Sequence, residues 1–105
     1  MKQRPSPLPE YDAQTAIDAL AQALSALKDA SEIRAFLEDL CTPAELEAMG
    51  DRWRVVPMLL AGTPYREIHD RSLVSVTTIG RVARFLRQET HSGYRMALER
   101  IKKKA

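Results

Sequence analysis

The sequence predicts an all-α protein of about six short helices, and three observations support this fold class. Leucine and isoleucine residues recur at spacings of three and four in several windows, which places them on one face of a helix. No window shows the strict alternation of apolar and polar residues that is typical of a half-buried strand. Aromatic residues make up only 6% of the 105 residues. We therefore expect helices packed on helices.

The chain is long enough for one domain. Residues 1–10 contain three prolines and little to bury, so we expect a flexible N-terminal arm followed by one helical domain over residues 11–105. The first helix is predicted over residues 12–28. Asp29 and Glu32 then form a capping box that begins a second, short helix.

The third predicted helix has the clearest start signal in the chain. Thr42 can cap the helix, Pro43 suits its first turn, and Glu45 completes a capping box. The helix is expected to continue to Gly62, which is a plausible stop. Pro57 lies inside this helix and removes one backbone hydrogen bond, so the helix should bend there.

Residues 64–88 are predicted to form a helix-turn-helix. A short helix continues to about Arg71, a tight connection follows, and Ser75 can cap a second helix that reaches about Glu89. A last helix begins near Tyr94. In a helix-turn-helix the second helix packs one face on the protein and places the other in the major groove of DNA.

The second helix of this motif has an apolar back and a polar front. At 100° per residue, the back consists of Ile79, Val82, Ala83 and Leu86. The opposite face consists of Thr77, Arg81, Arg84 and Gln88, and it is flanked by Thr78 and Gly80. Threonine and arginine can contact base edges and phosphates, and small residues allow a close approach. Arg66 and Arg71 on the preceding helix could hold the DNA backbone. The alternative is an ordinary amphipathic surface helix.

The charge is divided unevenly along the chain. Residues 63–105 carry a net charge of +6, and residues 1–62 carry −4. A basic half suggests a polyanionic partner such as double-stranded DNA, although a solvated charged surface is an equal alternative.

Several functional classes are not expected. Cys41 is the only cysteine, so neither an intramolecular disulfide nor a cysteine-based zinc site can form within one chain. The start of the sequence has no signal-peptide pattern and no stretch resembles a membrane span, so a cytoplasmic protein with no membrane partner is expected. No catalytic set, phosphate loop or metal-ligand spacing is present, so we expect neither an enzyme nor a metal.

The central part of the chain resembles the Trp repressor superfamily. The resemblance depends on Thr42-Pro43-x-Glu45, Glu47-Ala48-x-Gly50, Arg52, Arg54-Val55-Val56, Leu59-Leu60-x-Gly62, Glu67-Ile68 and Thr78-Ile79-x-Arg81. The tail, with Ser92-Gly93-Tyr94 and Ala97-Leu98-Glu99-Arg100, is similar to the branch often called YerC/YecD.

The resemblance implies an intertwined homodimer with two helix-turn-helix heads and DNA half-sites about one helical turn apart. The DNA-facing residues that it implies are Arg66, His69, Val76, Thr77, Thr78 and Gly80. The helical wheel selects three of these independently and adds Arg81 and Arg84. A solvated surface histidine is an alternative for His69.

The tryptophan corepressor site of the family would fall on Thr42, Arg52 and Arg81. Val82 stands where the family has glycine, and Phe85 stands where it has a small hydroxyl residue. Both add bulk where an indole ring would enter, and such overfilling costs about 1–3 kcal/mol. We therefore expect no cofactor and no control by L-tryptophan, with Arg52 and Arg81 serving structural or phosphate-binding roles.

The sequence thus predicts a sequence-specific, DNA-binding transcriptional regulator. The alternative is a dimeric interaction or adaptor protein that keeps the fold without specific DNA binding, with the acidic first half as its docking face. The turn is one residue shorter than the family pattern between Gly62 and Arg81, and with Pro57 this difference could alter the spacing of the half-sites.

Overall fold

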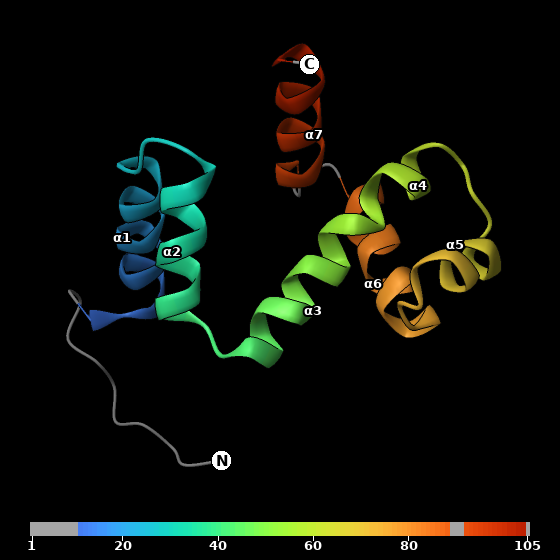
Figure 1. Ribbon diagram of the computed structural model, residues 1–105, viewed down its shortest axis with the longest axis horizontal. Helices are drawn as coiled ribbons and strands as arrows, with labels where there is room; N and C mark the ends of the chain where they lie inside the picture. Colours follow the sequence, from blue (N-terminus) through green and yellow to red (C-terminus); the bar gives the residue numbers. More distant parts are fainter. Residues whose placement is uncertain (1–10, 89–91, 105) are drawn as a thin grey trace. The chain divides into compact units, whose positions relative to one another are not determined.

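The computed structural model describes residues 11–88 and 92–104. Within these ranges the chain is all-helical and contains no strand, which confirms the predicted fold class (Figure 1). The elements are α1 (Ala13–Ser25), α2 (Ala30–Leu40), α3 (Pro43–Arg54), α4 (Val56–Leu60), α5 (Tyr65–Ser72), α6 (Val76–Arg87) and α7 (Gly93–Lys104). The predicted N-terminal arm, residues 1–10, lies outside the described residues. The chain divides into two compact units after Thr42.

The first unit contains α1 and α2, and both helices begin with an aspartate cap. The Asp12 carboxylate accepts a hydrogen bond from the Thr15 N–H at 2.7 Å. Asp29 accepts from the Glu32 N–H at 3.0 Å, and the Glu32 carboxylate accepts from the Lys28 N–H at 2.8 Å. The predicted reciprocal cap of α2 is therefore present, but Glu32 binds the N–H of Lys28 and not that of the cap residue Asp29.

The predicted long third helix is divided into two helices just before Pro57. α3 ends at Arg54 and α4 begins at Val56, with Pro57 in the first turn of α4. A proline there removes an N–H that has no partner within the helix. The helical ladder resumes with the Leu59 N–H, which donates to the Val55 carbonyl at 3.0 Å. Counting α3 and α4 as one bent helix gives the expected number of about six.

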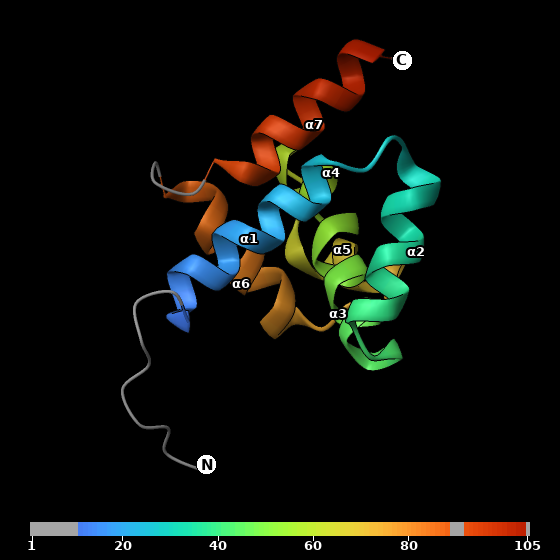
Figure 2. The same cartoon turned by 90° about the vertical axis from the view of Figure 1, so that its left-hand side faces the viewer.

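The core of the second unit joins α4, α5 and α6, which contact one another pairwise (Figures 1 and 2). The core side chains are Val55, Val56, Ile68, Val74, Ile79, Val82, Leu86 and Leu98. Burying one such side chain contributes about 1.5–3 kcal/mol. Trp53 lies beside this core and stacks on Tyr94 of α7, with 6.4 Å between the ring centroids. The core holds α5 and α6 in a fixed orientation. None of the described helices is long and apolar enough to cross a membrane.

Candidate nucleic-acid interface

Helix α6 has a buried back and an exposed front, as the helical wheel predicts. Ile79 and Val82 are fully buried, and Ala83 and Leu86 are nearly so. The front consists of exposed Thr77, Arg81, Arg84 and Gln88. Because the back is anchored in the core, the front faces solvent on a rigid support.

The start of α6 is fixed by Ser75, again as predicted. The Ser75 Oγ accepts a hydrogen bond from the Thr78 N–H at 3.2 Å, and it donates one to the Thr78 Oγ1 at 3.0 Å. Thr78 is half-buried. Its hydroxyl, which the sequence predicts to face DNA, accepts the hydrogen bond from Ser75. Val76 and Thr77 remain exposed in the first turn of α6.

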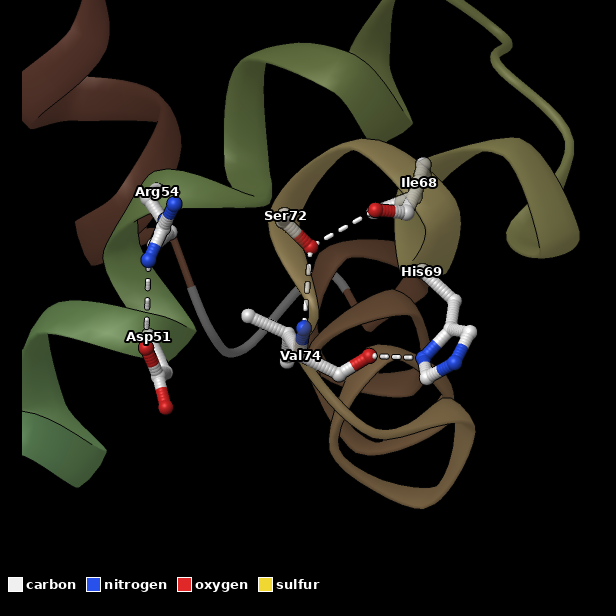
Figure 3. Close-up of polar contacts among 6 residues, drawn as sticks. All are labelled: Asp51, Arg54, Ile68, His69, Ser72 and Val74. Atoms are coloured by element: carbon white, nitrogen blue, oxygen red, sulfur yellow. Dashed lines mark hydrogen bonds and ion pairs between the residues drawn. The ribbon is translucent and has the colours of Figure 1, made fainter.

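The turn between α5 and α6 is built around Leu73, which has a left-handed backbone with φ 64° and ψ 9°. The buried Ser72 stabilises this turn, because its Oγ donates to the Ile68 carbonyl at 2.6 Å and accepts from the Val74 N–H at 3.1 Å (Figure 3). Val74 points into the core with 3% of its surface exposed. The motif therefore turns without a glycine.

His69 of α5 reaches across the same turn. Its Nδ1 lies 2.8 Å from the Val74 carbonyl oxygen and donates a hydrogen bond to it in the tautomer that carries the proton there (Figure 3). The ring is half-buried. Through this contact His69 supports the turn between the two helices of the motif.

The basic side chains of α5 and α6 differ in their pairing. Arg66 is exposed, whereas Arg71 forms an ion pair with Glu67 at 3.3 Å. Both partners of this pair are exposed, and such pairs contribute only about 0.3–0.5 kcal/mol. α6 contains Arg81, Arg84 and a third arginine but no acidic residue. Its cations have no carboxylate partner within their own helix.

Gly80 lies at the edge of the front, where a methyl group would find open space. A Cβ built on Gly80 meets no atom within 4 Å. Its backbone is helical, so neither packing nor conformation requires glycine at this position. A surface that another molecule approaches closely is one reason for a glycine inside a helix.

The predicted corepressor residues lie on separate parts of the chain. Arg52 is half-buried on α3, whereas Arg81 is exposed on α6. The guanidinium carbon of Arg81 lies 5.1 Å from the centroid of the Phe85 ring, which is a cation–π arrangement. Val82 is part of the core and has no exposed surface. Thr42 is the last residue of the first unit.

Comparisons with known proteins identify the family. The family model described as "Trp repressor protein" matches residues 15–102. The chain belongs to the Trp repressor family. It is also 37% identical over 86 residues, 82% of each chain, to "Uncharacterized protein YerC" of Bacillus subtilis (strain 168). No solved structure matches the chain.

Two features of the helix-turn-helix of this Trp repressor family member were not predicted from the sequence. The positive φ of Leu73 has no sequence signal, because such a position usually carries glycine or asparagine. The bond from His69 to Val74 joins residues five apart across a turn, and no helical period predicts it. The one available signal was Ser72, a hydroxyl residue at the end of a helix, which is a common source of local side-chain to backbone bonds.

Proposed function

We propose that this Trp repressor family member is a transcriptional regulator that binds double-stranded DNA sequence-specifically, as a homodimer, through α5 and α6. The observation that carries this proposal is the division of α6 into a buried back and an exposed front that carries threonine and arginine but no acid. Family membership supports a regulator rather than an enzyme. Within the described residues, no group of three or more potential metal ligands is present.

The roles that we assign follow from the chemistry of the exposed groups. Thr77 and Val76 at the start of α6 can meet base edges, and Val76, 52% exposed, suits a thymine methyl group. Arg81 and Arg84 can bind guanine or phosphate. Arg66, at the start of α5, is suited to the backbone and would set the register.

The proposed homodimer is supported by three helices that have no fully buried residue in the single chain. No residue of α1, α2 or α3 is buried. Large apolar side chains remain exposed on all three, including Ile17 at 56%, Leu40 at 51% and Met49 at 39%. A second copy of the chain would cover such surfaces, and sedimentation equilibrium should give twice the mass of 11.8 kDa.

We also propose that the regulator acts without L-tryptophan. The Phe85 ring already lies against the Arg81 guanidinium, and the Val82 side chain is fully buried in the core. Phe85 therefore takes the place beside Arg81 that the indole ring of a bound tryptophan would need. Arg52 and Arg81 then serve structure or phosphate binding.

Selection of bound fragments from genomic DNA tests the proposal. We expect enrichment of a two-fold symmetric sequence, and an affinity that falls with salt with a slope of about −0.9 per neutralised phosphate. Arg84→Ala should weaken binding to all sequences and reduce that slope by about one. Thr77→Ala should instead change the preferred bases.

Arg34→Ala is the matched control. It removes the same charge from α2, where Arg34 is exposed and pairs with Glu38 at 3.4 Å. It should leave the affinity and the salt slope unchanged. A selection that enriches no sequence would overturn DNA recognition. Stable binding of a protein partner without salt-dependent DNA retention would then favour the adaptor function, with the net-acidic segment 1–62 as the docking face.

A further inference from the structure

Leu73 combines two features that are unfavourable for a leucine. Its φ of 64° lies in the left-handed region, and it is the single non-glycine residue with positive φ among the described residues. Its side chain is 81% exposed, the largest fraction among the exposed large apolar side chains of the described residues. A strained backbone is expected to persist where function benefits from it. Neither folding nor solubility explains a leucine here.

The backbone conformation is imposed by the neighbours of Leu73. Its own N–H donates to the His69 carbonyl at 2.7 Å. The Ser72 hydroxyl and the His69 ring hold Val74 on the other side of the turn (Figure 3). These bonds fix the left-handed backbone, but none involves the Leu73 side chain. A glycine would satisfy the same turn without strain, so the isobutyl group must serve something other than the fold.

The position of Leu73 indicates what the side chain contacts. It lies in the turn that leads into α6, three residues before exposed Val76. The two helices that flank the turn carry exposed Arg66, Arg81 and Arg84. α6, into which the turn leads, contains arginine but no acidic residue. An apolar side chain next to this cationic helix is suited to the one apolar group that the major groove of DNA offers, the 5-methyl of thymine.

We propose that Leu73 is a specificity-determining residue that contacts the 5-methyl group of a thymine in the bound duplex, beside Val76. This inference rests on the proposed DNA-binding function and adds a contact from the turn to those of α6. The backbone of Leu73 is fixed by its neighbours and its side chain is 81% exposed, so the side chain is accessible to a bound duplex.

The test uses the full-length chain and the duplex that the wild-type chain selects. Each thymine of the half-site is replaced in turn by uracil, which lacks only the methyl group. At one position the wild-type chain should bind the uracil duplex roughly fourfold more weakly, as expected for the loss of one buried methyl group. Leu73→Ala should bind the thymine duplex more weakly and lose the discrimination between thymine and uracil at that position.

Two further variants separate the contact from the strain. Leu73→Gly should lose the same discrimination yet melt at a higher temperature than Leu73→Ala, because glycine adopts φ 64° without strain. Gly62→Ala is the matched control: Gly62 has φ 81° and open space for a Cβ. That change should lower the melting temperature without changing the thymine preference.

The outcomes are distinguishable. If the wild-type chain selects a sequence but Leu73→Ala retains both affinity and thymine discrimination, the inference is wrong and the proposed function stands. If the wild-type chain selects no sequence, both are wrong. If Leu73→Ala alters the mass of the assembly instead of base preference, Leu73 contacts a second copy of the chain and the inference is overturned.

Discussion

The Oγ of Ser72 donates a hydrogen bond to the carbonyl oxygen of Ile68, 2.6 Å away and one helical turn earlier. The same oxygen accepts from the N–H of Val74, and Ser72 itself is 6% exposed. One hydroxyl therefore ends α5 and positions the buried residue from which the chain enters α6. These two hydrogen bonds lie where the chain leaves α5 and turns toward α6.

Ser72→Ala should destabilise the second unit because it leaves the N–H of Val74 without its hydrogen-bond partner. Leaving a buried donor unsatisfied costs about 1–3 kcal/mol, and each kcal/mol lowers Tm by about 4–8 °C in a domain of this size. Urea unfolding measures the loss. Ser25→Ala removes an exposed hydroxyl that donates to the Gln22 carbonyl at 3.1 Å. If both variants unfold at the same urea concentration, the Ser72 bonds contribute nothing.

The sequence predicted those parts of the helix-turn-helix that depend on local periodicity. The burial of Ile79 and Val82 follows from the helical period, and the Ser75 cap follows from its place before an apolar run. Positive φ at Leu73 did not follow, because three surrounding side-chain and backbone bonds impose it against the preference of leucine. Such a conflict between the preference of one residue and the hydrogen bonds of its near neighbours is invisible to single-residue signals.

The candidate site could be predicted only as a face. The wheel placed Thr78 at the edge of the front, but it could not show that the hydroxyl is engaged by Ser75. It could not show that Arg81 lies over the Phe85 ring either, because the contact between residues four apart on one helix depends on their rotamers as well as on their spacing. Side-chain pairing of this kind depends on geometry beyond residue spacing.

The Asp12 cap should make the stability of α1 depend on pH. Hydrogen bonds from Thr15, first from its backbone N–H, hold the pKa of the Asp12 carboxyl below its ordinary value. Because the folded pKa is lowered, the stabilisation is present above the ordinary carboxyl pKa of about 3.9 and is lost as the pH falls through the folded value. Carbon-13 NMR titration of the carboxyl measures the pKa directly.

The control for this pH dependence is Asp12→Asn, which keeps an acceptor at the cap but removes the titrating group. Its α1 helicity at neutral pH should match that of the wild-type chain, and it should not change at acid pH through this site. An Asp12 carboxyl that titrates at or above its ordinary pKa would contradict the assignment of the cap.

L-tryptophan should neither stabilise the protein nor change its affinity for DNA. A ligand at a hundred times its Kd adds about 2.7 kcal/mol of stability, so binding would be evident as a rise in Tm. Phe85→Ser, which removes the ring beneath Arg81, is the informative variant. A rise in Tm with tryptophan for this variant alone would show that Phe85 closes the site. The same rise for the wild-type chain would show that the site is open.

Gly80→Ala should stabilise the fold and weaken DNA binding. Glycine within a helix costs about 0.5–1 kcal/mol relative to alanine, and a methyl group at Gly80 meets no protein atom within 4 Å. The added methyl would face the approaching duplex, so affinity should fall by about tenfold or more, equivalent to ~1.4 kcal/mol.

Gly50→Ala is the matched control, because Gly50 also lies within a helix and has open space for a Cβ. It should raise Tm by a similar amount and leave DNA affinity unchanged, as measured by fluorescence anisotropy on the selected duplex. If Gly80→Ala gains stability and binds DNA as tightly as the wild-type chain, α6 does not approach the duplex closely along this edge. The interface would then have to be centred on Thr77 and Arg84 instead.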